Sequence, residues 1–388
     1  MADSIDRRGF LDRAAGAWIG LSSRTVQGGA GSTGWTAGST AAHAAVDPEG
    51  APILPPRVNG GINIQPVRRL DMPGREEGLV IAPELVALQL QAVYALGFDA
   101  IRITAPHGDR RNFLAAVPYV RAARALGIDA LVVLSNFAGF TSARVLWDAQ
   151  QRRRHLELYD RVFTPPPPPA GTGEPGLARV GEVALQILNE PTLFFAVPPD
   201  VYVREILRPS YEALKRIHPG LTVVSAADVG TPEGVPRVRA MFDAGLEDAC
   251  DRIAYHVYDR SLIPLLSPSV RNAVWITESG AEGTSRHLGW VRETFPEIQA
   301  RIPGVSRIFY FQLFDTDPGR FRLIDIEPEG ASYRAVVESV DLHAHFAANV
   351  SRAAGGDPLL PFEVLVPDVR AYFPTAEDAE AYDGVFLG

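Results

Sequence analysis

The chain has 388 residues, of which 46% are hydrophobic, enough for a large buried core in one barrel-sized domain or two smaller ones. Its formal net charge of -9 argues against a nucleic-acid partner, because phosphate binding needs clustered cations. The single cysteine, Cys250, excludes an intrachain disulfide and a cysteine-based metal site, and the single lysine, Lys215, falls in a helix-like stretch unsuited to Schiff-base chemistry.

The N-terminal residues resemble an export signal. The segment Asp6-Arg7-Arg8-Gly9-Phe10-Leu11 is similar to a twin-arginine motif, residues 14–21 form a short apolar core, and Ala42-His43-Ala44 offers a cleavage site. We therefore predict a signal peptide over residues 1–44 and an exported protein, periplasmic or extracellular. The alternative is a disordered Gly/Ser/Thr/Ala tail with a chance pair of arginines. No other apolar run approaches the roughly 20 residues of a transmembrane helix, so we predict no membrane span and a soluble mature protein.

From residue 58 onward, apolar strand-like runs alternate with segments of helical periodicity. The predicted strands cover residues 58–65, 100–105, 130–135, 183–189, 221–226, 252–258, 273–278 and 307–314. The predicted helices cover residues 83–96, 112–126, 142–162, 202–218, 236–244, 286–302 and 332–346. This alternation predicts an α/β fold, a (β/α)8 TIM barrel over residues 45–346. A doubly wound sheet is the competitor, but no Gly-x-Gly-x-x-Gly loop follows the first strand.

Two segments outside the repeating pattern have no assigned chemistry. The five prolines at residues 165–169 predict a stiff surface connector or, alternatively, a proline-rich docking ligand. Residues 347–388 form a C-terminal extension that we expect to pack on the barrel, with a strand at residues 362–366 and one or two helical turns at residues 376–382.

Two predicted strands end abruptly on a glutamate that is followed by a turn signal. Glu190 is followed by Pro191, and Glu278 is followed by Ser279-Gly280. The C-terminal ends of the strands are where TIM barrels carry their catalytic residues. Two carboxylates on different strands are also the usual minimum for cleaving a glycosidic bond.

These glutamates belong to a set of short motifs that resembles glycoside hydrolase clan A, the group that contains families 5 and 39. The motifs are Asn189-Glu190-Pro191, His256-Val257-Tyr258 and Glu278-Ser279-Gly280, supported by Gly61-Ile62-Asn63, Ile101-Arg102-Ile103, Leu323-Ile324-Asp325 and Tyr333-Arg334-Ala335. They occur in the clan's order along nearly the whole predicted barrel, from Val58 to Phe346. The resemblance implies that Glu190 is the acid/base, that Glu278 is the nucleophile and that Asn189 contacts the sugar 2-hydroxyl.

The neighbouring polar residues fit these roles. Alternation along the second strand points Arg102 inward, where it and Tyr258 can hold Glu278 as a carboxylate. His256 is expected at the barrel mouth, although a core histidine is the alternative, and the glutamates could instead be ion-pair partners or helix caps. Further expected sugar contacts are His107 and Asn136, and Phe314, which stands where clan members commonly place a tryptophan. Asp228, Asp259 and Asp315 also fall near strand ends, without an assigned role.

The sequence therefore predicts a monomeric retaining hydrolase that cleaves β-glycosidic bonds of an oligo- or polysaccharide without a metal or organic cofactor. A transglycosylase could use the same two glutamates, and a catalytically silent carbohydrate-binding barrel is the alternative from another class. A metal-dependent barrel hydrolase fits less well, because the first strand ends in Asn63-Ile64-Gln65 rather than in a His-x-His pair.

Overall fold

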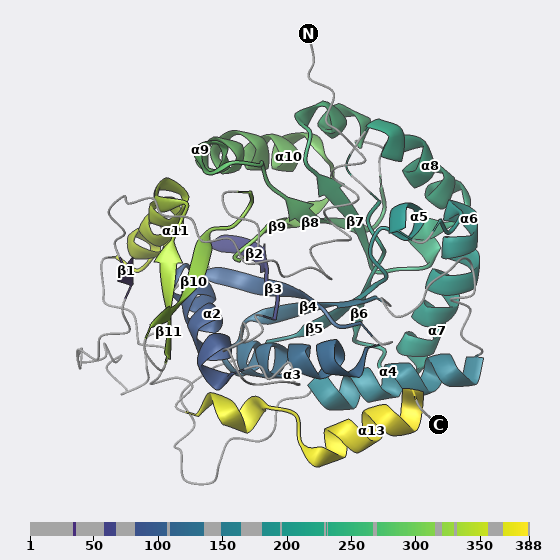
Figure 1. Ribbon diagram of the computed structural model, residues 1–388. Helices are drawn as coiled ribbons and strands as arrows, with labels where there is room; N and C mark the ends of the chain where they lie inside the picture. The colour runs from purple at the N-terminus through teal and green to yellow at the C-terminus, as the bar shows by residue number, and fades with distance from the viewer. Residues whose placement is uncertain are drawn as a thin grey trace.

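The centre of the computed structural model is a closed barrel of eight parallel strands, β2 to β9, surrounded by helices (Figure 1). The structure describes residues 34–35, 58–66, 82–106, 109–135, 149–163, 181–194, 196–228, 230, 232–266, 270–314, 320–329, 332–355 and 368–386. The barrel closes where Gly61 of β2 pairs with Phe309 of β9. The predicted (β/α)8 TIM barrel is thus confirmed.

All eight predicted barrel strands are present, in the predicted order. They are β2 (Asn59–Asn63), β3 (Phe98–Thr104), β4 (Asp129–Leu134), β5 (Val183–Ile187), β6 (Thr222–Val224), β7 (Arg252–Val257), β8 (Ala273–Ser279) and β9 (Val305–Tyr310). The first and the last residue of each strand lie within four residues of the predicted ones. Strands buried on both faces are nearly continuous apolar runs, which is why the sequence pattern located them.

The helices follow the predicted segments, with interruptions. They are α2 (Pro83–Ala95), α3 (Arg110–Ala125), α4 (Ala149–Phe163), α5 (Pro191–Phe194), α6 (Pro199–Val201), α7 (Arg208–Ile217), α8 (Val235–Asp243), α9 (Thr284–Gly289), α10 (Phe295–Arg301), α11 (Val340–Ala353) and α13 (Ala376–Phe386). π-Helical turns join α6 to α7 and α9 to α10. Gly97 and Gly127 have left-handed φ values of 67° and 64°, as expected for glycines that end α2 and α3. Within the described residues, no helix has the length and apolar character needed to span a membrane.

The prediction of a helix over residues 332–346 is wrong in its first half. Residues Ser332–Val337 form β11, which pairs antiparallel with β10 (Ile324–Glu329) outside the barrel, and β1 (Gly34–Trp35) pairs with β11. Helix α11 begins only at Val340, so the expected boundary between residues 346 and 347 falls inside this helix. The apolar residues Tyr333, Val336 and Val337 have helical i, i+3, i+4 spacing, but pairing with β10 decides their conformation.

The C-terminal helix α13 lies beside α3 and α4, against the side of the barrel (Figure 1). The carboxylate of Asp378 forms a buried ion pair with Arg121 of α3, at 3.0 Å. The ring of Tyr382 lies 5.1 Å from that of Phe113, centroid to centroid. The helix expected at residues 376–382 is present and extends to Phe386. The strand expected at residues 362–366 lies outside the described residues, as does the proline run at residues 165–169.

The barrel interior consists of an apolar layer below a polar layer. The apolar layer contains the small side chains of Ala100, Ala184 and Ala254 with the large rings of Trp275 and Phe309. Two residues further along three of these strands come the buried polar side chains Arg102, Gln186 and His256. Because side chains at positions i and i+2 point to the same face of a strand, the polar layer faces the C-terminal mouth of the barrel.

Candidate active site

Glu190 is presented on a tight turn directly after β5. Leu188 and Glu190 adopt left-handed φ values of 65° and 46°, which are unfavourable for residues with a Cβ and are typical of functional sites. The backbone N–H of Glu190 donates to the carbonyl oxygen of Ala227, beyond β6, at 3.0 Å. The turn is therefore fixed to the segment that follows β6, and the Glu190 side chain is only 8% exposed.

Glu278 is positioned by an irregularity between β7 and β8. Tyr255 lies opposite Ile276, but the next residue, His256, lies opposite Glu278, so Thr277 is an extra residue on β8. A bulge of this kind redirects the side chains that follow it. It places His256 and Glu278 next to each other at the mouth of the barrel.

Arg102 connects four polar residues of the barrel interior. Its guanidinium donates to Glu278 Oε1 at 2.6 Å, and the bonds that fix its orientation go to Asn63 Oδ1 (2.7 Å), Asn189 Oδ1 (2.7 Å) and Gln186 Oε1 (3.0 Å). The Arg102 side chain is 4% exposed, so these interactions are largely shielded from water. A buried guanidinium needs an anionic partner, and Glu278 supplies it.

The second oxygen of Glu278 is bound by Tyr258. The Tyr258 hydroxyl donates to Glu278 Oε2 at 2.7 Å. Burial and the negative charge of Glu278 raise the pKa of Tyr258 well above its usual value, which keeps the hydroxyl protonated. Both oxygens of Glu278 therefore have a hydrogen-bond donor.

His256 lies between the two glutamates. Its Nδ1 is 2.6 Å from Glu190 Oε1 and its Nε2 is 3.4 Å from Glu278 Oε1. A carboxylate oxygen of Glu190 and one of Glu278 lie within 4.8 Å of each other. The two acidic side chains therefore converge on one space at the mouth of the barrel.

The environments of the two carboxyl groups shift their pKa values in opposite directions. Burial raises the pKa of Glu190, and the negative charges of Glu278 and Asp228 raise it further, against the lowering effect of the hydrogen bond to His256. Burial alone would also raise the pKa of Glu278, but interactions with His256, Arg102 and Tyr258 outweigh it and lower that pKa. Glu278 is thus the stronger acid of the pair, and Glu190 keeps its proton to higher pH.

The structure brings together six of the residues singled out from the sequence: Glu190, Glu278, Arg102, Asn189, His256 and Tyr258. It places Phe314 elsewhere, 7% exposed in the main hydrophobic core. The aromatic rings beside Tyr258 are instead those of the half-buried Phe311, at 5.9 Å between centroids, and of Phe321, at 5.6 Å. His107 and Asn136 lie outside the described residues.

Two members of the cluster, Asn63 and Gln186, had no role assigned from the sequence, although each is a polar residue at an inward position of a predicted strand. Of the unassigned aspartates, Asp228 is buried and bonded to Arg237 Nε at 2.6 Å, whereas Asp259 accepts from the backbone N–H of Ser261 as a helix cap. Asp315 lies outside the described residues.

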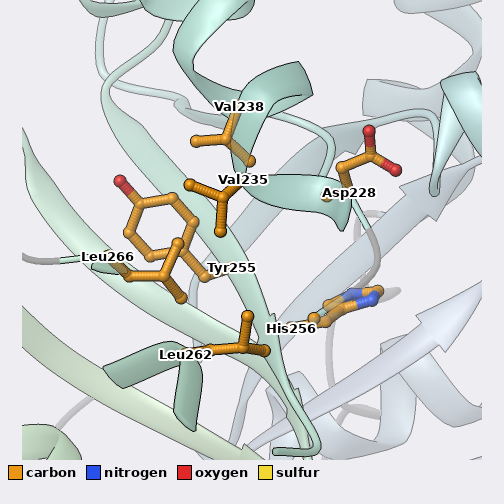
Figure 2. Close-up of a pocket in the computed structure, with 9 residues that line it drawn as sticks. Asp228, Val235, Val238, Tyr255, His256, Leu262 and Leu266 are labelled. Atoms are coloured by element: carbon orange, nitrogen blue, oxygen red, sulfur yellow. The ribbon is translucent and has the colours of Figure 1, made fainter. Parts of the chain in front are cut away.

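A small cavity lies behind His256, between β7 and α8. Figure 2 shows Tyr255 grouped with Val235, Val238 and Leu266 on the helix side of β7, while His256 points away from them. The space has room for about one water molecule and apolar walls, so it is too small for a sugar.

Glu190, His256 and Glu278 also form a group whose ligand atoms could hold a metal ion. However, both oxygens of Glu278 already accept hydrogen bonds, one from the Arg102 guanidinium and one from Tyr258. A cation would have to displace that guanidinium or approach it closely. The donor set therefore suits a carboxylate that is stabilised by hydrogen bonds better than it suits a resident metal.

Comparison with solved structures finds proteins that resemble this chain. The catalytic domain of GH30 xylanase C from Talaromyces cellulolyticus matches with a TM-score of 0.50 and 12% identity, over 76% of this chain and 77% of that one. A monomeric beta-xylosidase from Caulobacter crescentus CB15 matches with 0.46 and 16%, over 77% and 70%. Thermotoga maritima Cel5A, solved with cellobiose, matches with 0.43 and 16%, over 69% and 91%.

The match to the xylanase domain, at a TM-score of 0.50, agrees with the barrel fold; at 12% identity it shows the fold alone. No family model matches the chain, and no curated protein matches it.

Proposed function

We propose that the protein is a retaining β-glycoside hydrolase in which Glu278 is the nucleophile and Glu190 the acid/base. The observation that carries this proposal is the approach of the two carboxylates to within 4.8 Å, with pKa values shifted in opposite directions. Retaining glycosidases have carboxyl groups about 5–5.5 Å apart, whereas inverting enzymes keep roughly 6.5–9.5 Å to admit a water. The spacing favours retention.

In the first half-reaction, the Glu278 carboxylate attacks the anomeric carbon while protonated Glu190 gives its proton to the departing oxygen. The ionised form of Glu278 is maintained by Arg102 and Tyr258. Asn189, held by Arg102 at 2.7 Å, lies beside the reacting groups and suits contact with a sugar hydroxyl. The glycosyl bond to the leaving oxygen breaks as a glycosyl ester forms on Glu278.

The second half-reaction uses the change of charge at Glu278. Once Glu278 is an ester, its negative charge no longer raises the pKa of Glu190, and the pKa of Glu190 falls. Glu190 can then take a proton from water as the water attacks the anomeric carbon. Two inversions restore the original β configuration.

The same site would serve a transglycosylase if an acceptor sugar replaced water. A silent carbohydrate-binding barrel is less well supported, because binding alone does not require a carboxylate pair with opposed pKa shifts. The proposal also includes a carbohydrate substrate and catalysis without a metal or organic cofactor. It further includes export by the twin-arginine route and a monomeric state.

The test is an azide-rescue experiment on an activated aryl β-glycoside. Glu278→Ala should lose hydrolysis, and azide should restore turnover with an α-glycosyl azide as product. Glu190→Ala should keep partial turnover, because the leaving group needs no proton, and azide should give a β-glycosyl azide. Glu293→Ala, an exposed glutamate, is the control.

Retention itself can be followed by proton NMR of the first product anomer. An α-anomer formed first would refute the double displacement. Unchanged activity in both glutamate variants would refute the assignment of the site.

A further inference from the structure

A pair of glutamine side chains lies where the first and eighth strands of the barrel meet. Gln65 Nε2 donates to Gln312 Oε1 at 2.9 Å. Gln65 comes two residues after Asn63, and the backbone N–H of Ile64 still bonds to the Arg102 carbonyl at 2.9 Å, so the extended pairing continues past β2. Gln65 therefore projects from the same face of the strand as Asn63, about 6.6 Å closer to the mouth.

Gln312 is fixed just as firmly. Its side chain is 2% exposed, and it directly follows Phe311, whose ring lies against Tyr258. The N–H of Leu313 donates to the Asn63 carbonyl at 2.9 Å, which ties this segment to β2. The amide pair thus lies one layer above the group formed by Asn63, Arg102 and Glu278.

The two amides keep hydrogen-bonding capacity after bonding each other. Each side-chain amide has two N–H donors and one carbonyl acceptor, and within the described residues the bond between Gln65 and Gln312 is the one side-chain bond that either makes. Whichever way the amides are turned, donors and an acceptor remain for a ligand. A sugar hydroxyl both donates and accepts, so it can satisfy such a pair.

The charges nearby favour a neutral ligand. The Arg102 guanidinium is occupied by Glu278, Asn63, Asn189 and Gln186. The carboxylate of Glu278 would repel a sugar carboxylate or sulfate placed next to it, and the amide pair offers no countercharge.

On the basis of the proposed function, we propose that Gln65 and Gln312 form a specificity-determining pair that binds hydroxyl groups of a neutral glycone sugar. Under this proposal, a sugar bound above Glu278 contacts this pair next to the ring of Phe311. A glycone that carries a carboxylate should be excluded. The rival explanation is that the amide bond only joins the first and eighth strands.

The variants Gln65→Met, Gln312→Met and the double variant keep side-chain volume but remove the amides. Gln89→Met is the matched control, because the Gln89 amide is also buried and bonded, to Tyr119 at 2.7 Å, but between helices α2 and α3. The substrates are 4-nitrophenyl β-glucoside, β-xyloside and β-glucuronide. Their common aryl leaving group confines any difference to the glycone.

Each single variant should raise KM for a neutral glycoside about three- to tenfold, as expected for one lost hydrogen bond, with kcat within about twofold. The wild type should cleave the glucuronide far more slowly than the neutral glycosides. Calorimetric binding of the thio-linked neutral glycosides, whose sulfur linkage resists cleavage by general acid catalysis, should weaken by the same factor. Gln89→Met should lower thermal stability but leave KM and thioglycoside binding unchanged.

Two results would overturn the inference. One is a double variant that binds neutral thioglycosides as the wild type does, while only its melting temperature falls. The other is a wild type that binds the glucuronide best or binds no thioglycoside. Failure of the proposed function would show differently, as hydrolysis that persists in Glu278→Ala.

Discussion

Replacing Tyr258 with phenylalanine tests the electrostatic asymmetry of the site with the smallest possible change. The substitution removes one O–H donor, 2.7 Å from Glu278 Oε2, and keeps the ring that packs against Phe311 and Phe321. A hydrogen bond to a charged group contributes about 1.5–3 kcal/mol net. This bond is stronger when Glu278 is ionised, so its loss raises the pKa of Glu278.

The consequence should be visible in the pH dependence of kcat/KM for an aryl β-glycoside. The acidic limb, where Glu278 becomes protonated, should move to higher pH in Tyr258→Phe. At pH values below the acidic limbs of both the variant and the wild type, kcat/KM of the variant should be about ten- to 150-fold lower than that of the wild type. The factor follows from the lost hydrogen bond, because 1.4 kcal/mol corresponds to a factor of ten. The basic limb, which depends on Glu190, should move much less.

Tyr255→Phe is the matched control. Tyr255 lies on β7, which Tyr258 directly follows, but it points away from the site, and its buried hydroxyl has no hydrogen-bond partner within the described residues. Its removal should leave both limbs in place. Coincident acidic limbs in Tyr258→Phe, Tyr255→Phe and the wild type would refute the claim that Tyr258 stabilises the charged nucleophile.

Three further changes probe the support of the site. Gly61→Ala would put a Cβ 2.1 Å from the Phe309 ring, so urea titration should show a loss of at least about 1–3 kcal/mol in unfolding free energy. Asp378→Ala leaves Arg121 buried without its carboxylate and should cost about 3–5 kcal/mol, with kcat unchanged. Asp228→Asn removes a charge that raises the pKa of the proposed acid/base, so the basic limb of kcat/KM should move to lower pH.

The barrel could be predicted because its signals are local. Strands covered on both faces need apolar side chains throughout, and each glutamate at a strand tip interrupts such a run. Gly97 and Gly127 predicted two helix ends, because the residue after a helix often adopts a left-handed conformation that glycine accepts most easily. These features depend on a residue and its nearest neighbours in the chain.

The features that could not be predicted depend on how strands pair. The bulge at Thr277 exists only relative to the register with β7, which a short sequence window on β8 does not contain. In the hairpin of β10 and β11, pairing between neighbouring segments overrides a helical spacing. The choice between Phe311 and Phe314 depended on where β9 ends: the expected end was Phe314, but the strand stops at Tyr310.

The different roles of the two glutamates in the proposed mechanism follow from the groups that contact each of them. Glu278 is reached by Arg102, which crosses the barrel interior from β3, and by Tyr258, just beyond β7. Glu190 has His256 as its bonded partner among the described residues and faces a second carboxylate, Asp228. Because a buried carboxyl ionises only where donors or cations compensate the lost hydration, these contacts favour the ionised form of Glu278 and the protonated form of Glu190, as the proposed mechanism requires.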